Sequence, residues 1–181
     1  MKSYKSEFGY RLLKPFILIR FKLKYRPTVI GKENIPKEGA VIFCGNHRTY
    51  LDPPLIVITA GRHMRFMAKE ELRKNPLFAF LCVVFEGIWV KRDSKDISAM
   101  KEAMKTLKSG GCIGIFPEGT RHGMEKNGKA QNGAAFMALR AGVPVIPVGI
   151  SGDMKPFHVV KIHYGKPIDF SQYQTNKPEK E

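Results

Sequence analysis

The sequence predicts an α/β fold, in which a mixed and largely parallel sheet is covered by helices on both faces. Short apolar runs such as AVIFCG (40–45) and CIGIF (112–116) are hydrophobic throughout, as is typical of strands buried on both faces. Segments with helical spacing alternate with these runs along the chain. With 181 residues, 43% of them hydrophobic and 26% charged, the chain suits one globular domain.

The first 26 residues are predicted to form a separate basic segment that precedes this domain. Its cations, against the single acid Glu7, are Lys2, Lys5, Arg11, Lys14, Arg20, Lys22, Lys24 and Arg26. Apolar residues lie between them, which predicts a short basic amphipathic helix to about Arg20, and the alternation in IRFKLKY (19–25) then predicts a strand. Such a helix suits docking onto an anionic bilayer, and a solvated helix packed on the domain is the alternative.

The domain is expected to span residues 27–170 and to alternate strands with helices. The predicted strands are 40–45, 65–69, 88–91, 112–116, 143–150 and a late edge strand within 159–168, and the predicted helices are 53–61, 77–85, 94–111 and 134–142. Glycines end several of these helices, as helix C-termini favour. Residues 171–181 are expected to form a frayed tail.

The composition indicates the kind of partner and the compartment. A net charge of +15 predicts an anionic partner. The cysteines Cys44, Cys82 and Cys112 each lie in an apolar run, which predicts buried reduced thiols in a reducing compartment. We find no signal peptide and no apolar run near the ~18 residues that a membrane span needs, so the protein is not expected to cross a membrane, and a position on its surface stays open.

The stretch NHRTYLD (46–52) places His47 five residues before Asp52. Neither a helix nor a strand brings residues at this spacing together, so the chain must turn between them if they act as a pair. Asp52 precedes two prolines and is predicted to cap a helix with one carboxylate oxygen while the other holds the imidazole. A hydrogen-bonded histidine without a catalytic role is the alternative.

If the pair is catalytic, the aspartate fixes the imidazole tautomer and the histidine removes a proton from a hydroxyl group. The sequence presents no serine or cysteine in a nucleophile motif, so the hydroxyl is expected to belong to the substrate. A metal site is not favoured, because no third ligand lies near His47.

Three further groups follow predicted strands and suit a phosphate. Lys69, Lys91–Arg92 and the turn FPEGTR (116–121) each bring a cation to a strand end. Since ligands of open α/β sheets bind beyond the carboxyl ends of strands, these cations predict a site for a phosphomonoester. A turn with a surface arginine is the alternative for FPEGTR.

Four stretches in order, NHRTYLD (46–52), GIWVKR (87–92), FPEGTR (116–121) and VPVIPV (143–148), resemble the glycerolipid acyltransferases, most of all the bacterial lysophosphatidic acid acyltransferases. The resemblance covers about residues 29–165. It implies an acyltransferase fold and an enzyme that needs no cofactor or metal. It also implies a cytoplasmic protein bound peripherally to the inner face of the cell membrane. It also implies His47 as general base with Asp52 as its partner, and phosphate binding by Lys69, Arg92, Glu118, Gly119, Thr120 and Arg121.

The reaction implied by the resemblance is acyl transfer from an acyl thioester, on acyl-carrier protein or coenzyme A, to the sn-2 hydroxyl of lysophosphatidic acid. Apolar residues within 53–60 and 77–85 are candidate walls for the acyl chain. Transfer to glycerol 3-phosphate or another lysophospholipid is one alternative. A nucleic-acid-binding domain is the other, but the chain lacks a helix-turn-helix, zinc-finger or RNP-like motif.

Overall fold

The computed structural model describes residues 12, 15–16, 19–20, 23–91, 96–119, 132–153, 155, 157–170 and 173. The strands are β1 (Thr28–Ile30), β2 (Val41–Gly45), β3 (Met64–Lys69), β4 (Ile88–Val90), β5 (Cys112–Ile115), β6 (Val145–Gly152) and β7 (Val160–Tyr164). The helices are α2 (Asp52–Ala60), α3 (Pro76–Val84), α4 (Ile97–Lys108) and α6 (Gly133–Ala141), with 3₁₀ turns η1 (Lys32–Asn34) and η2 (Glu70–Lys74).

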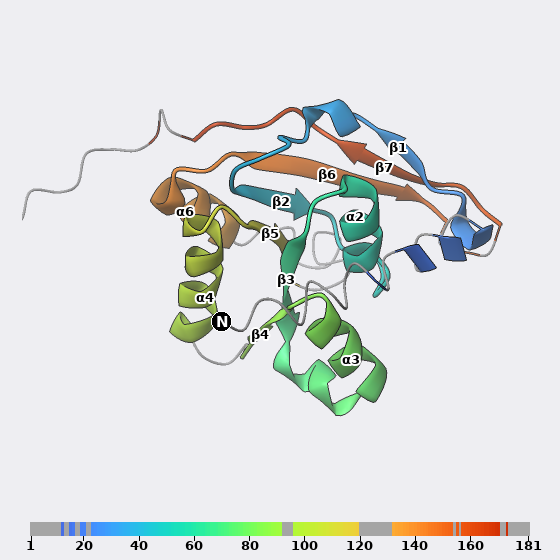
Figure 1. The fold of residues 1–181 in the computed structure, drawn as a ribbon, viewed down its shortest axis with the longest axis horizontal. Coiled ribbons are helices and arrows are strands. Elements are labelled where there is room, and N and C mark those ends of the chain that lie inside the picture. Colours follow the sequence, from blue (N-terminus) through green and yellow to red (C-terminus); the bar gives the residue numbers. More distant parts are fainter. Residues whose placement is uncertain are drawn as a thin grey trace, which may run out of the picture.

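The described strands form one sheet in the order β1-β7-β6-β2-β5-β3-β4 (Figure 1). Neighbouring strands are parallel except β6 and β7, which pair antiparallel. The predicted mixed, largely parallel α/β sheet is therefore confirmed. This order also makes β6, β2, β5, β3 and β4 a continuous parallel block whose carboxyl ends share one edge of the sheet.

Alternate residues of the strands serve two hydrophobic cores, one on each face of the sheet. Val41 and Phe43 of β2 pack on the side of α2, whereas Ile42 packs on the side of α4 and α6. The period of two follows from strand geometry, since successive side chains leave opposite faces. Because both faces are covered, β2 is hydrophobic at every position, which explains its uniform apolar run.

Local signals at the helix ends match the predicted elements. Gly61 and Gly142 adopt left-handed backbone conformations directly after α2 and α6, a conformation that favours glycine. Asn75 begins α3, with its side chain accepting from the backbone N–H groups of Leu77 and Phe78. None of the helices in the described part of the chain has both the length and the hydrophobicity that crossing a membrane requires.

Three predictions at the two ends of the chain need correction or lie outside the description. The strand predicted over 19–25 is wrong, because residues 19–20 and 23–25 are helical. The last strand, β7, is not an edge strand, because the short strand β1 pairs along its outer side. Three residues are too few to show an alternating pattern, so β1 escaped prediction. Most of the predicted segment 1–26 and nearly all of the tail 171–181 lie outside the described residues.

Candidate active site

The turns after β2, β5 and β3 lie together, because these strands are parallel neighbours in the sheet. The turn after β2 carries His47, the turn after β5 carries Glu118 and Gly119, and β3 ends at Lys69. Sheet order thus gathers residues that are up to 72 positions apart in the sequence, counted from His47 to Gly119. The carboxyl edge of a parallel sheet is where ligands of such folds bind.

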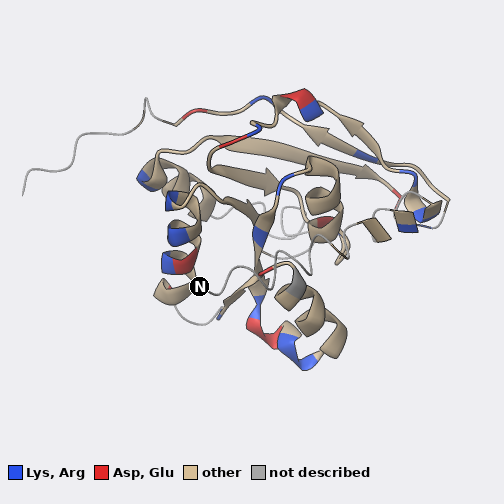
Figure 2. Cartoon of the chain, in the orientation of Figure 1, with Lys and Arg blue, Asp and Glu red and all other residues tan. Residues whose placement is uncertain are grey.

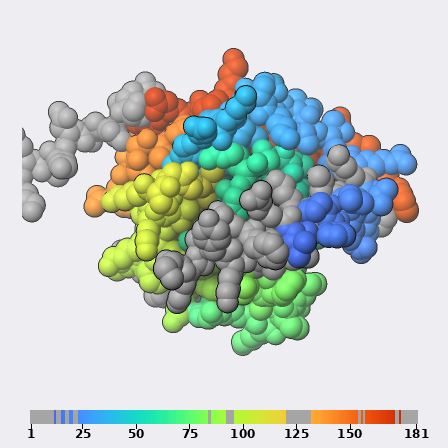
Figure 3. Space-filling view, viewed as in Figure 1, coloured from blue at the N-terminus to red at the C-terminus, as the bar shows by residue number. Residues whose placement is uncertain are grey.

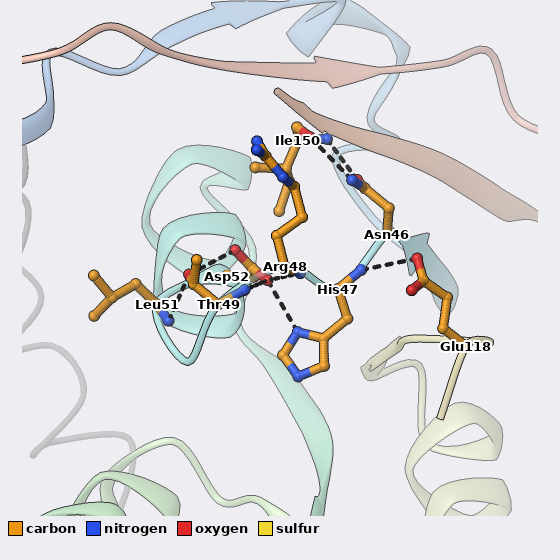
Figure 4. Close-up of polar contacts among 8 residues, drawn as sticks. All are labelled: Asn46, His47, Arg48, Thr49, Leu51, Asp52, Glu118 and Ile150. Atoms are coloured by element: carbon orange, nitrogen blue, oxygen red, sulfur yellow. Dashed lines mark hydrogen bonds and ion pairs between the residues drawn. The ribbon is translucent and has the colours of Figure 1, made fainter. Parts of the chain in front are cut away.

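The chain reverses between His47 and Asp52, so that the two side chains meet (Figure 4). The Nδ1 atom of His47 lies 2.9 Å from Oδ2 of Asp52. Asp52 is fully buried, whereas the His47 side chain remains 18% exposed. A buried carboxylate beside a partly exposed imidazole is the arrangement that fixes one tautomer and leaves the other ring nitrogen for a substrate.

The Asp52 carboxylate is fully occupied by the turn that precedes it. Its Oδ2 also accepts from the backbone N–H of Arg48 at 2.6 Å and of Thr49 at 2.7 Å, and its Oδ1 accepts from the Thr49 hydroxyl at 3.0 Å. The predicted capping role of Asp52 is wrong: no side-chain hydrogen bond caps α2, and the Leu55 N–H donates to the Leu51 carbonyl instead. Both carboxylate oxygens therefore serve the turn and the imidazole.

Hydrogen bonding to an ionised carboxylate requires the proton of a neutral His47 ring to lie on Nδ1. Nε2 is then the basic nitrogen. Phe116, at the end of β5, stacks on the imidazole with ring centroids 4.2 Å apart, and Phe66 of β3 stacks behind Phe116 at 5.4 Å. These aromatic rings restrict rotation of the imidazole, so the basic nitrogen keeps one direction.

Hydrogen bonds to β6 and to the turn after β5 hold the turn itself. The Asn46 amide both donates to the carbonyl of Ile150 at 3.0 Å and accepts from its N–H at 2.7 Å, so it extends the β2–β6 pairing. The Arg48 guanidinium donates to the carbonyl of Gly152 at 2.6 Å. Oε1 of Glu118 accepts from the His47 N–H at 3.1 Å (Figure 4).

A cavity of about 630 Å³ opens beside His47. Its apolar lining comes from α2, β3, α3, β4 and the end of β5, and includes Pro53, Val57, Phe66, Phe78, Leu81, Phe85, Trp89 and Phe116. Both stretches predicted as walls for an acyl chain, 53–60 and 77–85, contribute to it. A volume of this size lies within the range typical of small-molecule sites.

The cavity has a polar part that contains two of the predicted phosphate ligands, Lys69 and Gly119. Lys91 also lines it and lies 3.9 Å from Glu70, which pairs in turn with Arg73 at 3.6 Å. Of the other predicted ligands, Glu118 is described but is not among the residues that line the cavity. Arg92, Thr120 and Arg121 lie outside the described residues.

Comparison with known proteins decides the family. A family model described as acyltransferase matches residues 26–151, which is more than half of the chain. This chain belongs to the acyltransferase family. A 1-acyl-sn-glycerol-3-phosphate acyltransferase of Borreliella burgdorferi is 37% identical over 122 residues, which are 66% of this chain and 49% of that protein. One of Bacillus subtilis is 30% identical over 129 residues, 68% of this chain and 62% of that protein.

A solved structure supports the same family. The crystal structure of the 1-acyl-sn-glycerophosphate acyltransferase PlsC from Thermotoga maritima matches with a TM-score of 0.71 and 29% identity, over 97% of this chain and 76% of that one. This acyltransferase chain spans about half the length of the curated relatives it matches first, 49% and 55% for the first two.

Sequence reasoning missed three residues that shape the site of this acyltransferase. Thr49 binds Asp52 and also accepts from the Leu51 N–H, and its position three residues before an aspartate in a turn was an available signal. The position of Asn46 directly after a predicted strand was a weaker signal that its side chain belongs to the site. Phe116 gave none, because an aromatic residue at a strand end is indistinguishable from an ordinary core residue.

The ionisable groups of this acyltransferase that lie around the cavity show two clear shifts. Burial raises the pKa of the Cys82 thiol to about 11. Hydrogen bonds from the Lys91 N–H, the Ser98 hydroxyl and the Ala99 N–H lower the pKa of Asp96 to about 2. Asp96 thus stays ionised at neutral pH and ties the end of β4 to the start of α4.

The cysteines and metal-ligand types of this acyltransferase suggest no further chemistry. The three cysteines are free; Cys112 is buried, whereas Cys44 and Cys82 are half-buried rather than fully buried as predicted. Burial raises the pKa of each thiol, so none is an activated nucleophile. Within the described ranges, no cluster of three or more His, Cys, Asp or Glu is arranged to hold a metal ion.

Proposed function

We propose that this chain transfers a fatty acyl group from an acyl thioester to the sn-2 hydroxyl of lysophosphatidic acid, giving phosphatidic acid. The observation that carries the proposal is the hydrogen bond between the buried Asp52 and His47, which lines a largely apolar cavity. Two similar proteins are named 1-acyl-sn-glycerol-3-phosphate acyltransferases, which supports this choice of acceptor.

In the proposed reaction His47 is the general base. Its Nε2 takes the proton of the substrate hydroxyl as the oxygen attacks the thioester carbonyl, and the charge of Asp52 stabilises the imidazolium that forms. The tetrahedral intermediate then expels the thiolate, the C–S bond breaks, and the imidazolium returns the proton to sulfur. The ester C–O bond is formed directly, so no covalent enzyme intermediate is needed.

The acceptor phosphate is proposed to bind Lys69, Arg92 and Arg121, with Gly119 and Thr120 completing the site. Support comes from the position of Lys69 and Gly119 in the lining of the same cavity as His47. Glu118 is proposed to contribute by holding the turn, because its carboxylate accepts from the His47 N–H. Its charge also suits an ion pair with a neighbouring cation.

The acyl chain is proposed to occupy the apolar part of the cavity between α2 and α3. Residues such as Val57, Phe78 and Leu81 offer only hydrocarbon and aromatic surface there. The donor is an acyl thioester of either coenzyme A or acyl-carrier protein. The first carries phosphates and the second is acidic, so either suits a chain with a net charge of +15, as does an anionic membrane surface.

Purified protein assayed with both donors against lysophosphatidic acid, glycerol 3-phosphate and lysophosphatidylcholine tests the proposal. We expect acylation of lysophosphatidic acid to exceed that of the other acceptors. The His47→Ala variant is expected to lose turnover, whereas His163→Ala, which alters an exposed histidine of β7, keeps it. Undiminished turnover in His47→Ala, with the same thermal melting curve, refutes the assignment.

A further inference from the structure

Helix α3 is apolar on two opposite sides. Toward the cavity it presents Phe78, Leu81 and Cys82. On the other side lies an outer stripe, which we define as Leu77, Phe80 and Val83, at positions i, i+3 and i+6. These side chains are 60%, 54% and 68% exposed. A helix that is hydrophobic all round is normally buried on every side, so the outer stripe calls for an apolar environment.

The surroundings of the outer stripe indicate what kind of apolar environment this is. The segment before α3 carries charged residues, whereas α3 itself has none (Figure 2). Around the N-terminal end of α3 and the end of the neighbouring β4 lie the cations Lys69, Arg73, Lys74 and Lys91, against the acids Glu70 and Glu71. In the space-filling view, η2 and α3 lie at the lower edge of the molecule (Figure 3).

Helix α3 is also connected to the turn that carries the proposed base. Tyr50, three residues after His47, packs against Phe78 with ring centroids 4.7 Å apart. Both residues line the cavity. One side of α3 therefore forms a wall of the cavity near the turn, while the other side is exposed.

We propose that the outer stripe of α3 inserts into the interfacial region of an anionic lipid bilayer. The proposal rests on the proposed function in one respect: a single-chain acceptor and a two-chain product reside in a bilayer, and a docked α3 brings the cavity wall next to it. Apolar side chains enter the boundary of the acyl chains while the neighbouring lysines and arginine contact anionic headgroups, as in other monotopic proteins. No residue of this surface belongs to the basic segment 1–26.

The first test measures flotation of the full chain with vesicles of phosphatidylglycerol and phosphatidylethanolamine. The Phe80→Ser variant is expected to lower the partition coefficient roughly tenfold, because a phenyl group is withdrawn from the apolar phase. Phe136→Ser is the matched control, since Phe136 is 51% exposed on α6, nearly the same as Phe80. Phe136→Ser is expected to bind these vesicles as tightly as the unaltered chain does. The unaltered chain and both variants are expected to bind vesicles of phosphatidylcholine alone more weakly than these anionic vesicles.

An equal loss in both serine variants, or no loss in either, overturns the proposal. So does a shift of Phe80→Ser to a smaller species on size-exclusion chromatography without vesicles, because a second copy of the chain would then cover the stripe. Thermal melting of each variant shows whether it is folded.

A second measurement does not depend on the serine variant folding. Trp89 is the only tryptophan of the chain, so a Trp89→Phe background allows one reporter to be introduced. With Phe80→Trp we expect strong quenching by lipids that carry a nitroxide on the acyl chain, and with Phe136→Trp none. An unquenched Phe80→Trp reporter on bound protein overturns the proposal.

Neither vesicle experiment requires a donor or an acceptor, so this inference and the proposed function fail separately. Phe80-dependent binding without acyl transfer leaves the lipid surface standing and removes the enzyme assignment. Acyl transfer together with equal vesicle binding by Phe80→Ser and Phe136→Ser supports the enzyme assignment and removes the lipid surface.

Discussion

The exchange Asp52→Asn tests the proposed role of the carboxylate, because it removes the charge while keeping the shape. An amide oxygen in place of Oδ2 still accepts from His47 Nδ1 and from the Arg48 and Thr49 N–H groups. The amide nitrogen then replaces Oδ1 beside the Thr49 hydroxyl, which has a lone pair to accept its hydrogen bond. The tautomer with the proton on Nδ1 is therefore retained.

The magnitude follows from the geometry. At an effective dielectric constant of about 20, opposite unit charges separated by the 2.9 Å between Nδ1 and Oδ2 attract by about 6 kcal/mol. The neutral amide keeps an ordinary hydrogen bond and the imidazolium is partly exposed to solvent, so about half of this attraction is lost, roughly 3 kcal/mol. We expect kcat to fall about 10²-fold, since each 1.36 kcal/mol corresponds to about tenfold.

The assay follows thiol release from the acyl thioester at saturating lysophosphatidic acid, together with thermal melting. Because every hydrogen bond of the turn can be remade, Tm is expected to fall by no more than about 6 °C, at roughly 2–4 °C per kcal/mol for a domain of this size. Asp52→Ala is the contrasting variant: it leaves the N–H groups of the turn unpaired and lowers both kcat and Tm. Wild-type turnover in Asp52→Asn would refute the charge argument.

Three further changes probe the support of the site. Asn46→Ala removes both hydrogen bonds to Ile150 and is expected to cost about 1–3 kcal/mol in urea unfolding and to lower kcat more than it changes KM. Gly114→Ala adds a Cβ that overlaps the Phe66 ring, so it is expected to cost about 1–3 kcal/mol and to lower turnover through the Phe66–Phe116–His47 stack. Gly149→Ala in β6 is the control for overlap, because a Cβ added there meets only the Cβ of His163, at 3.8 Å. For Cys82, the folded pKa of about 11 lies above the ordinary 9.0, so the protonated thiol stabilises the fold below pH 9 and this contribution is lost as the pH rises toward 11. Iodoacetamide labelling of Cys82, followed by mass spectrometry, should accordingly be slow at pH 8 and accelerate toward pH 11.

The sequence predicted the central strands and helices well, because burial on two faces imposes long apolar runs and glycine ends the helices. It failed where those signals are absent. β1 has three residues, two of them exposed, so its sequence cannot be told from that of a turn. β7 alternates because its Lys161 and His163 face solvent, which is typical of an edge strand, yet β1 pairs beside it. Edge position depends on a partner that the strand's own residues do not encode.

For the site, the sequence predicted which strand ends carry polar groups but not how the groups divide their hydrogen bonds. His47 and Asp52 were singled out because a pair at a spacing of five can meet only through a turn, and because NHRTYLD resembles the acyltransferase motif. Glu118 was predicted to complete the phosphate site, and the hydrogen bond that its carboxylate accepts from the His47 N–H was not predicted. That contact depends on β2 and β5 being neighbours, and sheet order is not written in either segment.

The two prolines after Asp52 explain why its carboxylate is available to His47. The first N–H groups of a helix normally need acceptors, and a capping aspartate supplies one. In α2, Pro53 and Pro54 have no N–H to satisfy, Asp52 donates to the Thr49 carbonyl and Leu55 donates to the Leu51 carbonyl. No donor of the first turn is left for the carboxylate, which can therefore face back into the preceding turn. Replacing Pro53 or Pro54 with alanine would restore a donor, and we expect such a donor to compete with the imidazole for Asp52.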